Sequence, residues 1–165
     1  RCQNCHQSRI LGGKNIRTNS FAYIMPDCLI DMPAEAFIQA ERFDVMLTDT
    51  RYLLVTHSDR DHLYPYLLRW RYLKPGTPLP PPLDVVGPRF SEIEKLTICG
   101  NATVCELISS ELGDIPDLGL EDFKVEIRQV EPFEAIRLGD MEIETVRANT
   151  SSPIEPMNSM HARTG

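Results

Sequence analysis

Apolar and polar residues follow one another along this chain with the periods of both strands and helices. Residues 123–130 (FKVEIRQV) alternate apolar and polar, which is the period of a half-buried strand. Residues 52–56 (YLLVT) are almost wholly apolar, as expected for a strand in the interior of a sheet. Residues 34–43 combine good helix formers with apolar positions at helical spacing, which predicts a helix.

The same criteria predict further elements, and two of the turns are marked by Met25-Pro26-Asp27 and Gly139-Asp140. Strands and helices are interspersed and the last strands read as a meander, so we expect an α/β or α+β fold with a layered core. We expect one domain over residues 1–165, with a cysteine-containing loop at 1–20 and an irregular tail at 150–165. The other predicted strands are 21–24, 28–31, 83–86, 133–136 and 141–146, and the other predicted helices are 6–11, 62–73, 89–96 and 102–112.

Composition limits the classes of partner. The chain has 165 residues and a net charge of −7, which argues against a phosphate-tracking nucleic-acid surface. No apolar run approaches the roughly 20 residues that cross a bilayer, so we expect no membrane partner. The five cysteines are odd in number and irregularly spaced, which indicates a reducing compartment rather than a disulfide framework. We therefore expect a cytoplasmic protein.

The strongest candidate for chemistry is the stretch HSDRDH at residues 57–62, directly after the apolar strand. In an extended segment alternate side chains share a side, so His57, Asp59 and Asp61 would converge, and His62 follows them. Imidazole and carboxylate groups are ligands for zinc, iron or manganese. Four such groups in six residues could hold one metal ion and touch a second.

A structural interpretation of the same residues is also open. Asp59 or Asp61 could cap the following helix, where the helix dipole favours carboxylates. Pro65 would then lie in the first helical turn, where its missing N–H is harmless. Capping and metal binding are compatible with each other.

The order of residues at 54–65, LVTHSDRDHLYP, resembles the signature of the metallo-β-lactamase superfamily, a buried strand followed by Thr-His-x-His-x-Asp-His and a helix. Residues 12–20, the hairpin ending at residues 29–31 and the strand after residues 138–140 resemble one branch. That branch contains cyclic phosphodiesterases of phosphonate breakdown and relatives of the tRNA-processing endonuclease type. The resemblance covers roughly residues 1–149 and implies the N-terminal portion of an αββα sandwich.

The resemblance implies a metal-dependent hydrolase of the phosphodiesterase type, acting on a small phosphodiester or a similar ester through a metal-activated hydroxide. His57 and Asp59 would bind the first divalent metal with a further ligand. Asp61 and His62 would bind the second, and Asp61 would also orient the nucleophile. Zinc is the expected metal.

Two positions depart from the signature. Asp59 stands where the family has histidine, and a harder oxygen ligand there shifts the expected preference toward manganese or iron. Thr150 stands where the next metal-binding histidine is expected, and threonine is a poor ligand. His161, further along, is not assigned to that role.

Cys2 and Cys5 have the Cys-x-x-Cys spacing of a structural zinc site. The alternative is a pair of thiols without a metal. The branch that this chain resembles often carries a Cys-x-Cys-x-x-Cys motif here, with a distant histidine as a further zinc ligand. Cys2 and Cys5 match the last two cysteines of that motif. His6 could replace that ligand only in part.

A second function class is open as well. The departures at Asp59 and Thr150, and a partial sandwich, would also suit a non-catalytic domain that serves as a binding or oligomerisation module. A half sandwich would expose apolar faces and strand edges, which predicts a homo-oligomer. An aromatic and basic stretch at residues 64–72 is a further candidate for contacting a phosphate-bearing substrate, although such a face is more often half core and half solvated.

Overall fold

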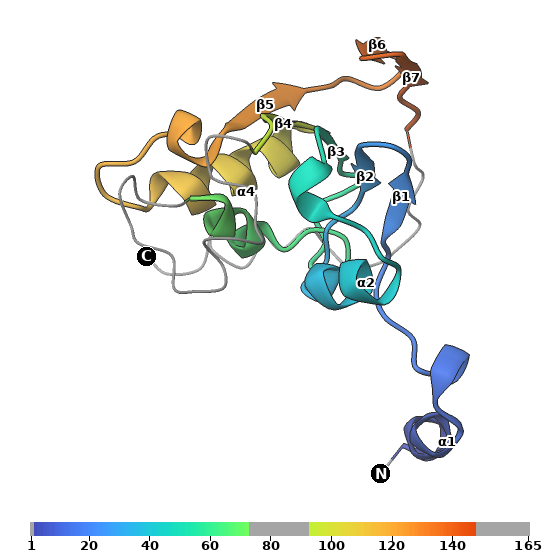
Figure 1. Ribbon diagram of the computed structural model, residues 1–165. Helices are drawn as coiled ribbons and strands as arrows, with labels where there is room; N and C mark the ends of the chain where they lie inside the picture. Colours follow the sequence, from blue (N-terminus) through green and yellow to red (C-terminus); the bar gives the residue numbers. More distant parts are fainter. Residues whose placement is uncertain (1, 73–92, 148–165) are drawn as a thin grey trace, which may run out of the picture. The chain divides into compact units, whose positions relative to one another are not determined.

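The computed structural model describes residues 2–72 and 93–147 (Figure 1). Residue contacts divide the chain into two compact units, Arg1–Val130 and Glu131–Gly165. The predicted strand at 83–86 lies outside the described residues, as do Thr150 and His161. The expectation of one domain over residues 1–165 stays a prediction.

The first unit is built on a five-stranded sheet whose strands follow one another in chain order. The first two strands form an antiparallel hairpin, and every later neighbour is parallel. The strands are β1 (Ala22–Ile24), β2 (Cys28–Ile30), β3 (Tyr52–Leu54), β4 (Leu96–Gly100) and β5 (Val125–Gln129). β2, β3 and β4 are largely apolar because crossover connections place helices or loops over the faces of a parallel sheet, whereas β5 alternates apolar and polar residues.

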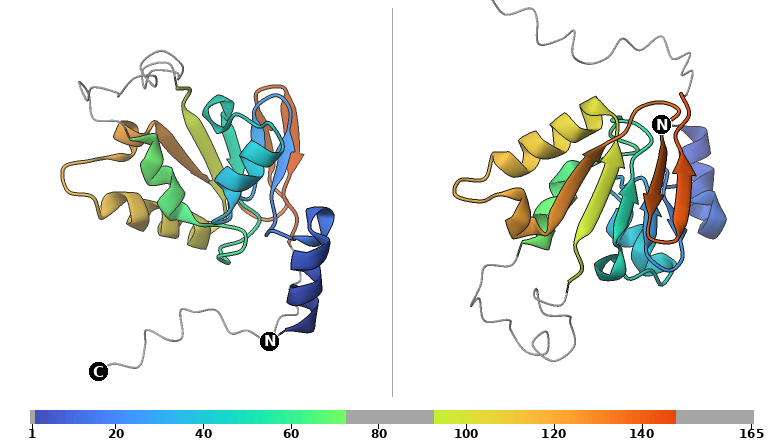
Figure 2. Two further views of the ribbon diagram at one scale, coloured as in Figure 1. Left: turned by 60° about the horizontal axis from the view of Figure 1, so that its bottom comes forward. Right: turned by 90° about the horizontal axis from the view of Figure 1, so that it is seen from above.

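Helices connect the parallel strands and contribute to the core (Figure 2). The longest, α4 (Ala102–Gly113), begins where the Asn101 side chain accepts a hydrogen bond from the Val104 N–H at 3.0 Å, a standard N-cap. It contacts β4 and β5 and buries Val104, Ile108 and Leu112. The remaining helices are α1 (Gln3–Leu11), α2 (Ala36–Arg42) and the 3-10 helices η1 (Gly13–Asn15), η2 (Leu47–Asp49), η3 (Pro65–Arg71) and η5 (Leu120–Phe123).

The core of this unit joins the parallel strands to α4, η3 and η5. Leu53 of β3 and Ile98 of β4 are both 0% exposed, and Phe123 of η5 is 1% exposed. Burying each such side chain contributes about 1.5–3 kcal/mol. Gly100 ends β4 against α4 so closely that a Cβ there would lie 2.4 Å from a methyl group of Val104. The absence of a side chain at Gly100 therefore allows this helix to approach the sheet.

The second unit contains the predicted hairpin of β6 (Ala135–Leu138) and β7 (Met141–Glu144). Gly139 occupies the turn with φ 58°, a left-handed conformation that glycine adopts at little cost. The hairpin continues beyond β7, since the Phe133 N–H donates to the Thr145 carbonyl at 2.7 Å. The pattern of apolar residues and the Gly-Asp turn predicted this hairpin correctly.

The predicted α/β class is confirmed, but three local predictions need correction. Residues 96–100 form β4, whereas the sequence pattern predicts that Leu96 ends a helix; a short apolar run fits a buried strand or a buried helix equally well. Residues 65–71 form a 3-10 helix rather than a helix over 62–73, because the chain up to residue 64 is tied to the segment after β2. The prediction that the last three strands form a meander is wrong. β5 pairs in parallel with β4, and β6 and β7 form a separate two-stranded sheet. Within the described ranges no helix combines the length and the apolar character that a membrane span requires.

Candidate metal centre

The candidate residues lie on the loop that follows β3, at the carboxyl edge of the parallel strands. The Val55 N–H donates to the Cys99 carbonyl at 2.9 Å, so the loop leaves the sheet beside β4. It returns beside β2, where the Met32 N–H donates to the His62 carbonyl at 2.7 Å. The Tyr64 N–H in turn donates to the Met32 carbonyl at 2.8 Å. Both ends of the loop are therefore anchored by backbone pairing, and this edge is where open α/β sheets commonly place their sites.

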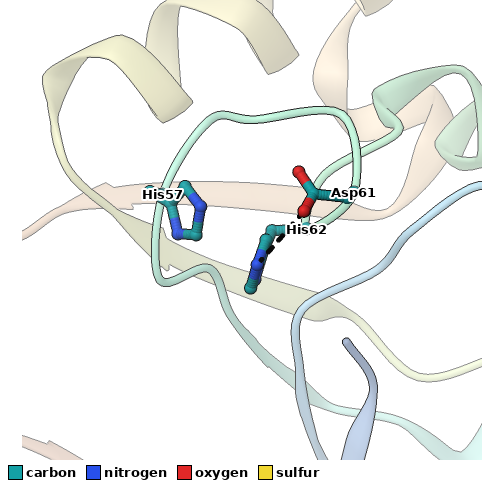
Figure 3. A group of neighbouring side chains, drawn as sticks. All are labelled: His57, Asp61 and His62. Atoms are coloured by element: carbon teal, nitrogen blue, oxygen red, sulfur yellow. Dashed lines mark ion pairs between the residues drawn. The ribbon is translucent and has the colours of Figure 1, made fainter. Parts of the chain in front are cut away.

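Three of the four predicted ligands converge on this loop. One ligand atom from each of His57, Asp61 and His62 lies within 4.8 Å of the others (Figure 3). The imidazole rings of the two histidines are 3.9 Å apart between centroids. Nε2 of His62 is 3.7 Å from Oδ2 of Asp61. The side chains of His57 and His62 are 34% and 22% exposed and that of Asp61 is 60% exposed, so the group opens to solvent.

Asp59 is placed differently from the other three. Its Oδ2 atom is 3.5 Å from Nε2 of His57, but its side chain is 74% exposed and it is not part of the converging group. Its backbone carbonyl accepts the N–H groups of His62 and Leu63, each at 2.8 Å, which closes the turn. Asp59 thus shapes the loop through its main chain, while its side chain lies at the rim.

The capping interpretation is wrong for both aspartates. The helical segment that follows is η3, whose N-cap is Tyr64, and no side chain hydrogen-bonds to that cap. Pro65 does occupy the first helical turn, as predicted. The carboxylates of Asp59 and Asp61 are therefore not used for capping η3.

A fifth residue, Asp31, completes the arrangement and was not among the predicted site residues. It follows β2, it is 1% exposed, and its backbone is left-handed with φ 61°. Its Oδ2 lies 2.6 Å from Nδ1 of His62, and its Oδ1 accepts hydrogen bonds from both the N–H and the hydroxyl of Thr56 at 2.9 Å. The sequence signal was a carboxylate directly after a buried strand. The sequence pattern alone identifies Asp31 only as the end of a predicted hairpin.

These contacts determine which ring nitrogens are available. The Nδ1–H of His62 donates to Asp31, so Nε2 carries the lone pair. The Thr56 hydroxyl donates to Asp31, and its oxygen lies 3.0 Å from Nδ1 of His57, where it can accept a hydrogen bond from the N–H of that ring. Both histidines can thus present Nε2, the arrangement typical of histidine ligands held by a carboxylate or hydroxyl behind them.

The donor set fits a divalent metal ion. Two imidazole nitrogens and one carboxylate oxygen are the protein ligands of many catalytic zinc sites, which keep further positions open. Asp31 and Asp59 add two further carboxylates beside the histidines, and their negative charge favours a cation. The residues present are therefore compatible with a metal ion held by His57, Asp61 and His62.

The other predicted binding features have a structural role or stay predictions. Cys2 and Cys5 are exposed at the start of α1, and hydrogen bonds from Cys5 lower the pKa of the Cys2 thiol. Within the described ranges neither belongs to a cluster of three ligating side chains, so structural zinc there stays a prediction. On η3, Arg69 pairs with Glu111 at 2.5 Å and Arg71 donates to backbone carbonyls, so these two cations hold the helix in place.

No family model matches the sequence, and no curated protein matches it. A solved structure described as a new diphosphatase from the PhnP family is similar, with a TM-score of 0.57 and 19% sequence identity. The match covers 87% of this chain and 48% of the other, so this chain spans about half the length of that protein. The chain therefore has a metallo-β-lactamase-like α/β fold, as the strand and histidine motif predicted.

Proposed function

We propose that this chain carries the metal-binding loop of a metal-dependent hydrolase, with a phosphoric ester or anhydride as substrate. The single observation that carries the proposal is the convergence of His57, Asp61 and His62 with the buried carboxylate of Asp31 behind His62. A second support is the similarity of fold to a protein described as a diphosphatase. A phosphodiester is the finer form of the proposal.

Different residues of the chain would bind the metal and orient its ligands. Nε2 of His57, Nε2 of His62 and the Asp61 carboxylate would hold a divalent metal, zinc first, with manganese or iron as alternatives. Asp31 keeps the proton on Nδ1 of His62 and prevents that ring from rotating. The metal would supply an acidified water and neutralise charge that develops on the phosphoryl oxygens.

Asp61 would have a second role because it is the most exposed of the three. A carboxylate has two oxygens, and one of them remains available when the other binds a metal. That oxygen could accept the proton that the attacking water loses as the new P–O bond forms and the bond from phosphorus to the leaving-group oxygen breaks. Asp59, at the rim beside His57, could bind a second ion only weakly because of its exposure.

The non-catalytic alternative is not favoured by the site. A decayed centre would have no need for a buried carboxylate whose hydrogen bonds all serve the loop, since an uncompensated buried carboxylate is costly. Asp31 keeps three such bonds, to Thr56 and His62. The arrangement is what a ligand-orienting group requires.

The test separates binding from hydrolysis. Isothermal titration of metal-free protein with zinc and with manganese should show saturable binding that His57→Ala removes. Hydrolysis of bis(p-nitrophenyl) phosphate, compared with a diphosphate and with p-nitrophenyl phosphate, then identifies the preferred bond. Equal metal affinity in wild type and His57→Ala would remove the proposed centre.

A further inference from the structure

A cavity of about 130 Å³ lies on the helix side of the sheet in the first unit. Leu29 and Leu53 contribute from β2 and β3, and Phe37 of α2 and Trp70 of η3 also line it. A dry cavity of similar size, about 150 Å³, is known to hold a molecule as large as benzene. None of the proposed metal ligands lines this space, so it is a separate feature.

Two aromatic side chains lie together in the cavity wall. Phe37 and Trp70 meet edge to face with ring centroids 6.3 Å apart. They are 45% and 71% exposed, so the wall they form reaches the surface. Trp70 is the single tryptophan of the chain, which makes its fluorescence a specific reporter for this place.

Thr50 places a polar group without a partner in the otherwise apolar lining. The residue is 3% exposed and lines the cavity, and its Oγ1 atom makes no hydrogen bond. Buried hydroxyl groups nearly always have a partner, because leaving one unsatisfied is unfavourable. A ligand with an acceptor atom would satisfy it.

Arg71 supplies a charge at the same cavity. Its Nε and Nη2 donate to the carbonyls of Phe123 at 3.2 Å and of Glu94 at 2.6 Å, which leaves further N–H donors. Burial lowers the pKa of the guanidinium to about 10. Although the chain has 24 acidic residues, none of them in the described ranges forms an ion pair with Arg71.

We propose that this cavity binds a small carboxylic acid anion with an apolar ring or branched chain, of about the size of benzoate. The apolar body lies against Leu29, Leu53 and the aromatic pair, and the carboxylate is held by Arg71 with Thr50 as an additional donor. A guanidinium matches the two oxygens of a carboxylate in a planar fork. The space is too small and too apolar for a nucleotide or a polyphosphate, which need several donors.

The experiment is a titration of the full chain followed by Trp70 fluorescence, with three probes. Benzoate should give a saturable change in fluorescence, and acetate should give none in the same concentration range. Benzyl alcohol should bind about tenfold or more weakly than benzoate, because it lacks the negative charge. Equal affinity for benzoate and benzyl alcohol, or no saturable change with benzoate, would overturn the proposal.

Variants test the two polar groups. Arg71→Met should lower the affinity for benzoate by about tenfold or more and leave the affinity for benzyl alcohol nearly unchanged. Arg71→Lys keeps the charge and should restore part of the preference for the anion over the alcohol. Thr50→Val keeps the shape of the side chain and should lower the affinity for benzoate severalfold. Arg42→Met, an exposed cation of α2 outside the cavity lining, is the matched control and should bind like wild type.

Far-ultraviolet circular dichroism identifies any variant that fails to fold. If Arg71→Met does not fold, Thr50→Val and Arg71→Lys decide the matter. Unchanged benzoate affinity in both of them would contradict the proposal, and reduced affinity in Thr50→Val with retained preference for the anion in Arg71→Lys would support it.

Discussion

Nδ1 of His62 lies 2.6 Å from Oδ2 of Asp31, although 31 positions separate the two residues in the chain. One follows β2 and the other lies on the loop after β3, and these strands are parallel neighbours. The pairing leaves Nε2 of His62 facing Asp61. The orientation of the His62 ring, a proposed metal ligand, therefore depends on a residue that follows a different strand.

Asp31→Asn should lower metal affinity by about 10–100-fold, as loss of a group behind a ligating histidine typically does. Asparagine tolerates the left-handed backbone at φ 61°, so the change removes the charge without straining the chain. Titration calorimetry with zinc measures the effect. Asp27→Asn, also a carboxylate next to β2 but paired with Arg51, is the control; equal affinities in wild type and Asp31→Asn would contradict the role.

Asp61→Asn and Asp59→Asn should differ in how strongly they reduce metal binding. The first removes a converging ligand and should weaken metal binding by at least about tenfold. The second alters a side chain that is 74% exposed, and an exposed charge contributes at most about 1 kcal/mol, or roughly fivefold. Metal content after gel filtration ranks the two variants. A larger loss in Asp59→Asn would make Asp59, rather than Asp61, the principal carboxylate ligand.

Metal binding should stabilise the fold. An ion at about 100 times its dissociation constant adds about 2.7 kcal/mol to the free energy of unfolding if it binds the folded chain alone. The melting temperature should therefore rise with zinc and fall back when a chelator is added. In the double variant His57→Ala, His62→Ala the melting temperature should not respond to zinc; an undiminished response would place the ion elsewhere.

Gly100→Ala should destabilise the protein by about 1–3 kcal/mol, the usual cost of overpacking. The new Cβ would lie 2.4 Å from Val104, which is 0% exposed and belongs to the core. Denaturant unfolding measures the change. Gly113→Ala is the control, because nothing lies within 4 Å of a Cβ there and alanine favours the end of α4. Equal stabilities of the two variants would mean that α4 does not pack closely on β4.

The thiols should react with Ellman's reagent in a definite order. Cys2 is exposed with a lowered pKa, so at pH 8 more of it is thiolate and it should react fast. Burial, with Asp27 and Cys99 nearby, raises the pKa of Cys28 to about 11, so it should stay protonated and unreactive until the chain unfolds. Added zinc should slow the reaction of Cys2 if the proposed structural zinc site exists. Fast labelling of Cys28 in the native state would contradict its burial.

Local patterns predicted the parts of this protein that depend on neighbouring residues. The strand ending near residue 56 and the cluster at residues 57–62 are consecutive, so the chain itself brings His57, Asp61 and His62 together. The hairpin of β6 and β7 was predicted for the same reason, since its turn residues lie between its strands. Alternation of apolar residues along one segment is a property of that segment alone.

Tertiary structure decided the features that join distant segments. β4 could be told from a helix only once parallel neighbours were present on both sides, because a short buried run carries no distinguishing period. Asp31 became a site residue only through the pairing of β2 with β3, and Thr50 and Arg71 meet one cavity from different elements. The sequence by itself therefore determined which side chains are candidate metal ligands. The register between strands determined how they are held, because that register depends on contacts between residues far apart in the chain.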